Sequence, residues 1–229
     1  MSIADNLRRI HDRIDAAAAR SGRSPDDVRL VAVTKYVGAA EVAELIAAGC
    51  RDLGESRPQE LWRKAEAMGN HAASAVRWHM IGHLQRNKVR RTLPFVAWIH
   101  SADNPTLLAE LAREAAHLDR PINVLLEINV SGDDTKHGLT PEAARELTPR
   151  LDDFQPLAIL GLMTMAAREG DLNVARANFA ALRHLLDELR EAAPGGLRFD
   201  ELSMGMSGDF EVAIEEGATI VRVGSALFA

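Results

Sequence analysis

Cysteine is almost absent from this chain of 229 residues, in which Cys50 is the single example. One cysteine cannot form an internal disulfide or a zinc site built from several thiolates, and reduced thiols are normal in the cytosol. We therefore expect Cys50 to be a small buried residue rather than a nucleophile.

Long apolar runs and an excess of basic residues are missing as well. No run approaches the ~20 residues of a membrane span, and residues 1–5 open a charged pattern without the apolar centre of a signal peptide. The net charge is −6, so no global positive field attracts nucleic acid or an anionic membrane. The basic run 86–91 has the pattern of a solvated helix face. These absences predict a soluble, cytoplasmic protein with neither nucleic acid nor a membrane among its partners.

Aromatic residues are scarce, at 4%, although hydrophobic residues make up 47% of the chain. A core of Ala, Leu and Val suits helices packed on a parallel sheet. The length fits one large domain, and no linker rich in Pro, Gly or Ser divides the chain. We therefore expect residues 1–229 to form a single domain.

Short apolar runs alternate with helical patterns along the chain. A first helix starts after Ser2 and ends at Gly22. The predicted strands are Val28–Thr34, Asp52–Gly54, Val76–Ile81, Val96–His100, Ile122–Asn129, Ala158–Met163, Phe199–Met204 and Thr219–Val223. The predicted helices between them are Ala39–Ala48, Gln59–Met68, Thr106–His117, Glu142–Leu147, Asn173–Leu189 and Asp209–Glu216. This alternation indicates βαβ units and a parallel sheet.

Eight strands are the number at which a parallel sheet closes into a (β/α)8, or TIM, barrel. The alternative is an open doubly wound sheet, which usually carries a glycine-rich loop after its first strand. Here the first strand ends in Thr34–Lys35–Tyr36, which favours the α/β barrel. In a barrel the functional groups follow the carboxyl ends of the strands, and phosphate often binds after strands seven and eight.

Lys35 stands directly after the first buried strand. Three interpretations are open: a surface lysine, a buried ion pair, or an amine that forms a Schiff base with a carbonyl compound. Desolvation would favour the neutral amine that attacks a carbonyl.

Two turns of small residues follow the last two predicted strands, at 203–209 and 223–225. Small residues let the backbone approach an anion, and Ser207 or Asp209 can cap the helix that follows. Either turn alone has the pattern of an ordinary cap. Side by side, and with a lysine at a strand end, they predict a site for a phosphorylated aldehyde, namely pyridoxal phosphate.

Arg222 lies near the end of the eighth predicted strand. Strand alternation puts Ile220, Arg222 and Gly224 on one face, so Arg222 could face the pyridine nitrogen, where Asp or Arg is the usual partner. An arginine cannot accept a proton, so the ring nitrogen would stay unprotonated. A neutral ring is a poorer electron sink, which suits storage or racemisation better than transamination.

Seven segments in this order resemble the pyridoxal phosphate homeostasis protein family, which is related to the N-terminal barrel of alanine racemase. They are Val31–Lys35, Gly54–Ser56 with Gln59–Glu60, Trp78–Gln85 with Asn87–Lys88, Lys136 with Gly138, Gly161–Met163, Leu202–Ser207 and Val221–Ser225.

The resemblance implies a set of cofactor-binding residues. Lys35 would carry pyridoxal 5′-phosphate as a Schiff base, and Arg222 would face the pyridine nitrogen. The phosphate would be held by Ser203, Ser207, Gly224 and Ser225. One departure is Ser56, where the family usually has Asn after Gly-Glu.

Two functions remain open. The first is a protein that buffers or delivers pyridoxal phosphate, with apo-enzymes as partners that receive it. The second is a racemase-like enzyme acting on small amino acids. Alanine racemases add a C-terminal β-domain, dimerise and use a tyrosine as second base, whereas this sequence ends with its eighth strand and has one tyrosine, Tyr36. The sequence therefore favours a monomeric carrier without catalytic residues, although His79, His83 and Lys136 keep the enzyme open.

Histidines could also ligate a metal. For His83 and His137, however, no third partner stands at metal spacing in the sequence. We expect surface or hydrogen-bonding roles for both, and no metal site.

Overall fold

The computed structural model describes residues 2–73, 76–133, 137–166, 171–195 and 197–229. Its eight parallel strands pair in sequence order, and β1 pairs with β8, so the sheet is a closed barrel. The strands are β1 Arg29–Val33, β2 Asp52–Glu55, β3 Arg77–Met80, β4 Val96–Ala102, β5 Asn123–Glu127, β6 Ala158–Met163, β7 Glu201–Ser203 and β8 Ile220–Val223. The predicted (β/α)8 barrel is confirmed. Each strand lies within its expected run or extends beyond the end of that run by one or two residues.

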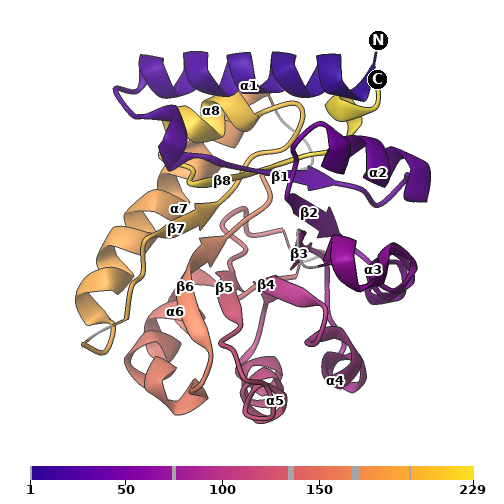
Figure 1. Cartoon of the computed structure of the whole chain (residues 1–229). Coiled ribbons are helices and arrows are strands. Elements are labelled where there is room, and N and C mark those ends of the chain that lie inside the picture. Colours follow the sequence, from indigo (N-terminus) through magenta and orange to yellow (C-terminus); the bar gives the residue numbers. More distant parts are fainter. Residues whose placement is uncertain (1, 74–75, 134–136, 167–170, 196) are drawn as a thin grey trace.

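Helices surround the strands as an outer ring (Figure 1). They are α1 Ile3–Arg20, α2 Ala39–Ala47, α3 Pro58–Ala73, α4 Val89–Thr92, α5 Pro105–Ala115, α6 Pro141–Leu147, α7 Leu172–Ala192 and α8 Phe210–Glu215. Short 3₁₀ helices are η1 Pro25–Asp27, η2 Arg86–Lys88, η3 Thr148–Phe154 and η4 Ser225–Leu227. The basic run 86–91 thus forms η2 and most of α4. None of the helices in the described part of the chain is long and apolar enough to cross a membrane.

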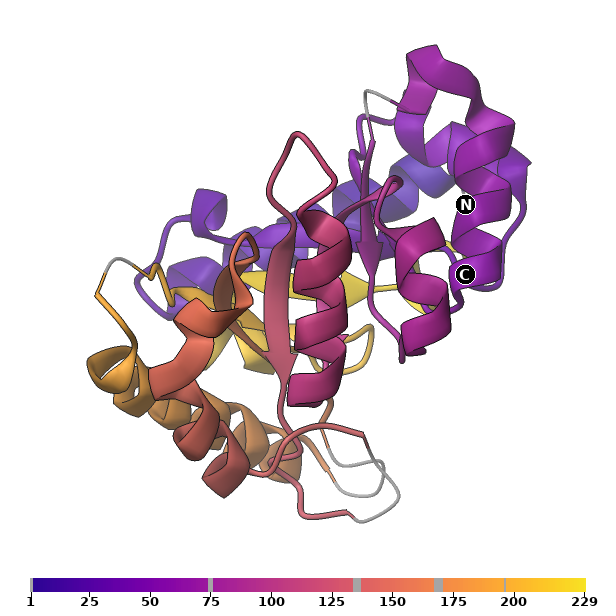
Figure 2. The same ribbon diagram turned by 90° about the horizontal axis from the view of Figure 1, so that it is seen from below.

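The first helix closes the outer ring. Ser2 and Asp5 form a capping box at its N-terminus, which satisfies backbone N–H groups that have no partner within the helix. Its apolar stripe is buried beside α8, and Figure 1 shows α1 lying along α8 at the place where a helix after β8 would stand. The buried Asn6 donates to the backbone oxygens of Leu227 and Ala229, both at 3.0 Å, so the two termini lie side by side (Figures 1 and 2).

Two apolar cores result from the alternation of side chains along the strands. The larger core fills the space between barrel and helices and includes Leu30, Ala32, Val221 and Val223. The smaller core lies inside the barrel and consists of Val31, Trp98, Leu125, Met163 and Ile220. The face predicted for Ile220 is therefore confirmed.

Polar side chains share the barrel interior with the smaller core. Their residues occupy inward positions on the strands and are almost completely buried: Asp52, His79, His100, Glu127, Ser203 and Arg222. Buried polar groups are tolerated only when they are hydrogen-bonded or paired. The hydrogen-bond partners of these six residues therefore determine which of their polar groups remain available to a ligand.

Candidate functional site

Closure of the barrel brings the predicted lysine and the two predicted turns to one place. Strand β8 lies between β7 and β1, with Ala32 paired to Val223 and Ser203 paired to Ile220. The chain segments that leave these three strands therefore emerge next to one another at the carboxyl ends of the strands. Residues 34–36, 204–209 and 224–225 form this part of the barrel mouth.

Lys35 is exposed, and its ammonium nitrogen lies 5.0 Å from the centre of the Tyr36 ring. Tyr36 is itself 86% exposed. The expectation that desolvation activates Lys35 is therefore not supported by this structure. The amine is instead open to a ligand that enters the mouth.

Other lysines are less suited to a Schiff base. Lys64 is buried and donates to Glu55 Oε1 at 2.5 Å and to the backbone oxygen of Thr34 at 2.6 Å. Lys88 lies on η2, away from the three strands. Lys136 falls outside the described residues. Among the lysines that the structure describes, Lys35 alone is both exposed and at the mouth beside the two turns.

Thr34, directly before Lys35, is hydrogen-bonded to buried side chains on the helix side of the barrel. Besides Lys64, Glu55 contacts Thr34, whose hydroxyl donates to Glu55 Oε1 at 2.6 Å. Glu55 faces the helix layer because it is out of phase with the inward Asp52 and Gly54. These buried contacts of Glu55, Lys64 and Thr34 hold the carboxyl end of β1 in place, directly before the exposed Lys35.

The turn after β8 presents backbone N–H groups to a single oxygen. The Ser207 hydroxyl accepts from Gly224 N at 3.1 Å and from Ala226 N at 3.4 Å. Ser207 and Gly224 are partly buried, and Ser225 is exposed. Convergent backbone N–H groups form a concavity that binds anions. Ser207 thus marks a position that a phosphate oxygen could take.

Gly205 allows the β7 turn to lie against α8. Its φ is +91°, and a Cβ there would stand 2.6 Å from Ala213 Cβ and 2.9 Å from Phe210 Cα. A side chain at this position would be strained and would collide with the helix. The turn therefore owes its course to this glycine, and Asp209 completes it by accepting from Met206 N at 2.6 Å.

Arg222 is 4% exposed and points into the barrel, as strand alternation predicts. It donates to Ser203 Oγ at 2.6 Å and to the Thr164 backbone oxygen at 2.8 Å. Burial lowers the pKa of its guanidinium to about 10, while the nearby Glu127 and Asp209 act in the opposite direction. Three further N–H groups of the guanidinium remain for other acceptors.

Ser203 was expected at the phosphate, and its surroundings point to another role. The residue is completely buried, and its hydroxyl lies 2.6 Å from Arg222 Nη1 and 2.9 Å from His100 Nδ1. A hydroxyl that accepts from arginine and contacts an imidazole nitrogen has little left to offer a phosphate. Ser203 therefore supports Arg222 in this structure.

A histidine pair continues inward from Ser203. His100 Nε2 lies 2.9 Å from His79 Nδ1, and His79 Nε2 lies 2.9 Å from Asp52 Oδ1. Asp52 in turn accepts two hydrogen bonds from Arg77, at 2.6 and 2.7 Å. Burial lowers the pKa of both imidazoles, most strongly that of His100, and for His79 it outweighs the opposing effect of Asp52. Burial therefore favours the neutral form of both rings.

Glu127 ends β5 at the mouth and is 4% exposed. Burial and the negative charge of Asp103 raise its pKa to about 7, against the opposing effect of Arg222. A carboxyl group that titrates near neutrality in a cleft is a candidate for proton transfer. Sequence reasoning missed Glu127, although a carboxylate near the end of the predicted strand Ile122–Asn129 was a usable signal.

His83 and His137 meet a third residue that the sequence did not reveal. Asp103 Oδ2 lies 3.0 Å from His83 Nδ1 and 3.8 Å from His137 Nδ1, and the three side chains could group around one metal ion. The two rings, however, stack at 4.3 Å with 15° between their planes. Because a metal ligated by an imidazole lies in the ring plane, at least one ring would have to rotate. As it stands, His83 is hydrogen-bonded to Asp103, and His137 stacks on His83.

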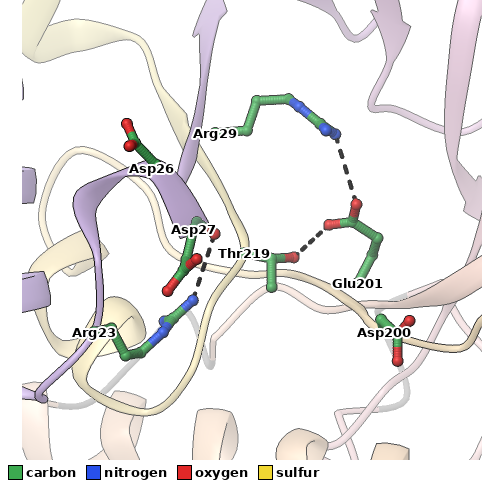
Figure 3. Close-up of a pocket in the computed structure, with 7 residues that line it drawn as sticks. All are labelled: Arg23, Asp26, Asp27, Arg29, Asp200, Glu201 and Thr219. Atoms are coloured by element: carbon green, nitrogen blue, oxygen red, sulfur yellow. Dashed lines mark hydrogen bonds and ion pairs between the residues drawn. The ribbon is translucent and has the colours of Figure 1, made fainter.

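The opposite end of the barrel holds a cavity of about 400 Å³ (Figure 3). It is lined by Arg23, Asp26, Asp27, Arg29, Asp200, Glu201 and Thr219. Arg29 begins β1 and Glu201 begins β7, so this cavity lies at the amino ends of the strands. Carboxylates outnumber arginines there, and barrel enzymes carry their chemistry at the other end. The mouth is therefore the candidate site.

Comparison with known proteins gives a consistent result. The family model "Alanine racemase, N-terminal domain" matches residues 6–229. Curated relatives called pyridoxal phosphate homeostasis protein include one from Aquifex aeolicus, 39% identical over 228 residues, covering 100% of this chain and 98% of the relative. Another, from Pseudomonas aeruginosa, is 40% identical and covers 99% of this chain and 95% of the relative.

Solved structures agree with these relatives. PipY of Synechococcus elongatus, in its structure with PLP bound, superposes with a TM-score of 0.86 at 37% identity and full coverage of both chains. A protein from Bifidobacterium adolescentis gives a TM-score of 0.91 at 40% identity, covering 99% of this chain and 94% of the other. The alanine racemase of Clostridium difficile, at 19% identity, covers 98% of this chain and 56% of the other with a TM-score of 0.72, and shares the fold.

Proposed function

This chain belongs to the pyridoxal phosphate homeostasis protein family, and from this premise we propose that it binds pyridoxal 5′-phosphate in order to buffer or deliver the cofactor. The observation that carries the proposal is the convergence of three strand ends. An exposed lysine and a pair of backbone N–H groups that converge on one oxygen leave neighbouring strands of the closed barrel.

The residues at the mouth fit a phosphorylated pyridine aldehyde. The N–H groups of Gly224 and Ala226, which contact Ser207 Oγ, would bind phosphate oxygens, with Ser207 and Ser225 as hydroxyl donors. The exposed amine of Lys35 would take the aldehyde. Arg222, a buried cation that interacts with acids only at a distance, would donate to the ring nitrogen.

Each of these residues has a distinct task. Lys35 would hold the cofactor as a Schiff base, in which its amine nitrogen replaces the aldehyde oxygen and water is the leaving group. The turns bind the phosphate and orient the ring. Arg222 can donate a proton only in a hydrogen bond and cannot take one up, so the ring nitrogen stays neutral. Ser203 holds Arg222 in place.

Storage suits this arrangement better than catalysis. A bound pyridoxal phosphate supplies an electron sink, and that sink is strongest when its ring nitrogen is protonated, which Arg222 prevents. Lys35 and its neighbour Tyr36 are open to water, whereas carbanion chemistry gains from a dry, preorganised site. We therefore favour a carrier in the cytoplasm that hands pyridoxal phosphate to apo-enzymes. A racemase-like enzyme is the alternative, because Glu127 provides one group that can exchange protons near pH 7.

The deciding experiment is to titrate pyridoxal phosphate into the purified protein and follow the yellow absorption band. Borohydride then adds hydride to the C=N bond, and mass spectrometry of the peptides locates the tagged lysine. We expect the tag on Lys35. Lys35→Ala should lose the band and keep the fold, whereas the control Lys88→Ala should keep both. A band in Lys35→Ala that survives dialysis would exclude Lys35 as the attachment point.

A further inference from the structure

An unbroken chain of buried hydrogen bonds crosses the barrel interior from Arg222 to Asp52. Arg222 contacts Ser203, Ser203 contacts His100, His100 contacts His79 and His79 contacts Asp52, with donor–acceptor distances between 2.6 and 2.9 Å. The three middle residues are completely buried. This series of hydrogen bonds begins near the carboxyl end of β8, at Arg222, and ends at the amino end of β2, at Asp52. We refer to Asp52, His79, His100 and Ser203 as the relay.

The two ends of this series of hydrogen bonds, together with two neutral imidazoles, permit only one arrangement of protons. A guanidinium can only donate, and an ionised carboxylate can only accept. Asp52 therefore requires a proton on His79 Nε2. A neutral His79 then accepts at Nδ1, so His100 donates from Nε2 and accepts at Nδ1. The Ser203 hydroxyl must donate to His100, and its oxygen lone pair is left for Arg222.

Asp52 is well secured as the accepting end. Its side chain is 8% exposed and binds Arg77 through both carboxylate oxygens. The hydrogen bonds from Arg77 and His79 hold the pKa of Asp52 far below its ordinary value, although burial alone would raise it. Neither histidine takes up a second proton readily, because that proton would place a positive charge in the closed core. The imidazole of His79 stacks on the ring of Trp98, with 5.8 Å between the ring centres and 2° between the ring planes, and this contact holds the plane of the imidazole.

We propose that Asp52, His79, His100 and Ser203 are positioning residues for Arg222, and that the anion at Asp52 fixes the direction of every hydrogen bond between them. Ser203 is thereby kept as an acceptor, and the guanidinium is held with one edge on Ser203 and Thr164. Its remaining N–H groups stay available to the ligand. The part that concerns the ligand rests on the proposed function; the direction of the hydrogen bonds does not.

The first test uses the protein without cofactor. Nitrogen NMR of ¹⁵N-labelled imidazoles reports which ring nitrogen carries the proton. In the unmodified protein, His79 and His100 should both be neutral and protonated at Nε2. In Asp52→Leu, which removes the acceptor and frees Arg77 to turn to water, the resonances of both rings should move toward the average of the two tautomers. Thr92→Val removes a buried hydroxyl that lies outside the relay, and it should leave both resonances unchanged.

The second test follows transmission to the ligand. Asp52→Leu and Ser203→Ala should each weaken retention of pyridoxal phosphate roughly 2- to 30-fold, the range expected for residues that act through a network. Each should also shift the absorption maximum of the bound cofactor. If Asp52 acts through Ser203, the double variant should retain pyridoxal phosphate no more weakly than Ser203→Ala alone, because Ser203→Ala already breaks the connection to Arg222. Thr92→Val should retain the cofactor normally.

Two results would overturn the inference. One is a His100 resonance that is identical in the unmodified protein and in Asp52→Leu. The other is full additivity of the two substitutions in cofactor retention, which would show that Asp52 does not act through Ser203. Should Asp52→Leu not fold, His79→Phe breaks the same series of hydrogen bonds, and the His100 resonance and cofactor retention are compared in the same way. If the unmodified protein bound no pyridoxal phosphate, the proposed function would fail, and the NMR measurement would still decide the direction of the hydrogen bonds.

Discussion

At the scale of single residues, the mouth combines a carboxyl group whose pKa is raised with a guanidinium that stays charged at neutral pH. Glu127 ends β5 with a pKa raised to about 7 by burial and by Asp103, while Arg222 opposes that rise. Arg222 and Glu127 are both almost completely buried. Substitutions here therefore act on charge as well as on shape.

Glu127→Gln should change how stability depends on pH. The folded protein binds the Glu127 proton more tightly than the unfolded chain does, so the free energy of unfolding falls as pH rises from about 4.5 to about 7. The loss is on the order of 3 kcal/mol, from the size of the pKa shift. Glu127→Gln should therefore stabilise the cofactor-free protein at pH 8 relative to the unmodified protein, and have little effect at pH 4.

Urea unfolding at the two pH values measures this difference. The control is Glu60→Gln, because the hydrogen bond from Arg63 lowers the pKa of the Glu60 carboxyl and the residue is not at the mouth. Equal stability of Glu127→Gln and the unmodified protein at pH 8 would contradict the assignment.

Arg222→Glu should alter the bound cofactor. A carboxylate at this position could share a proton with the pyridine nitrogen, so the absorption maximum should move and reaction with amino acids should become faster. Arg222→Lys keeps a donor that stays charged, and it should preserve the original spectrum with weaker binding because the planar fork is lost. A spectrum unchanged by Arg222→Glu in a folded protein would show that Arg222 does not contact the ring nitrogen.

At the scale of elements, the strand ends and turns carry the binding, and the terminal segments hold them in place. The turn after β8 leads straight into η4. The side-chain amide of Asn6, on α1, donates hydrogen bonds to the backbone oxygens of Leu227 and Ala229. The phosphate turn is thus attached to a helix from the other end of the chain.

Removing Ser207 and Ser225 hydroxyls together, as Ser207→Ala and Ser225→Ala, should weaken cofactor retention about tenfold or more, since charge-assisted hydrogen bonds contribute roughly 1.5–3 kcal/mol. The spectrum should hardly change, because these groups lie at the phosphate and not at the ring. Equilibrium dialysis gives the affinity, and Ser131→Ala, on the loop after β5, serves as the control. Retention equal to that of the unmodified protein would remove both serines from the site.

Asn6→Ala should destabilise the fold by about 1–3 kcal/mol, because a buried carbonyl oxygen loses its donor. Asn6 is 2% exposed, whereas the neighbouring Arg8 is exposed. Arg8→Ala should change the free energy of unfolding by less than about 0.5 kcal/mol. Thermal and urea unfolding compare the two variants, and equal effects would contradict the role of Asn6.

Much of this architecture was predictable from periodicity. The strands follow from short apolar runs, and the inward face of Arg222 follows from the alternation of Ile220, Arg222 and Gly224. The relay was not predictable, because its members come from four strands and only barrel closure brings them together. The role of Asp103 was hidden for the same reason. The exposure of Lys35 depends on how far β1 extends, and apolar content alone does not set that length.

At the scale of the whole molecule, the predicted site is built from one chain. Lys35, the two turns and Arg222 all belong to the same barrel, so we predict that cofactor binding needs no second copy. Retention of the cofactor should therefore not depend on protein concentration.

The protein should be a monomer with negligible racemase turnover. A neutral ring beside Arg222 stabilises a carbanion poorly, and an exposed Lys35 leaves the reacting atoms open to water. The measurement is the chirality of single enantiomers of alanine and serine during hours of incubation with cofactor-loaded protein, beside the mass in solution. Turnover of about 1 per second or faster, the low end for ordinary enzymes, would contradict the carrier and establish the enzyme.

The pairing of β1 with β8 also has a consequence for synthesis on the ribosome. Val33 is made 187 residues before Ile220, and at ~5–20 residues per second this interval lasts roughly 10–40 s. During that time the edge of β1 that pairs with β8 has no partner, and the apolar stripe of α1 lacks its packing against α8. An unpaired strand edge and exposed apolar surface favour aggregation, so we expect chaperones at the ribosome exit to bind the newborn chain until its last strand emerges.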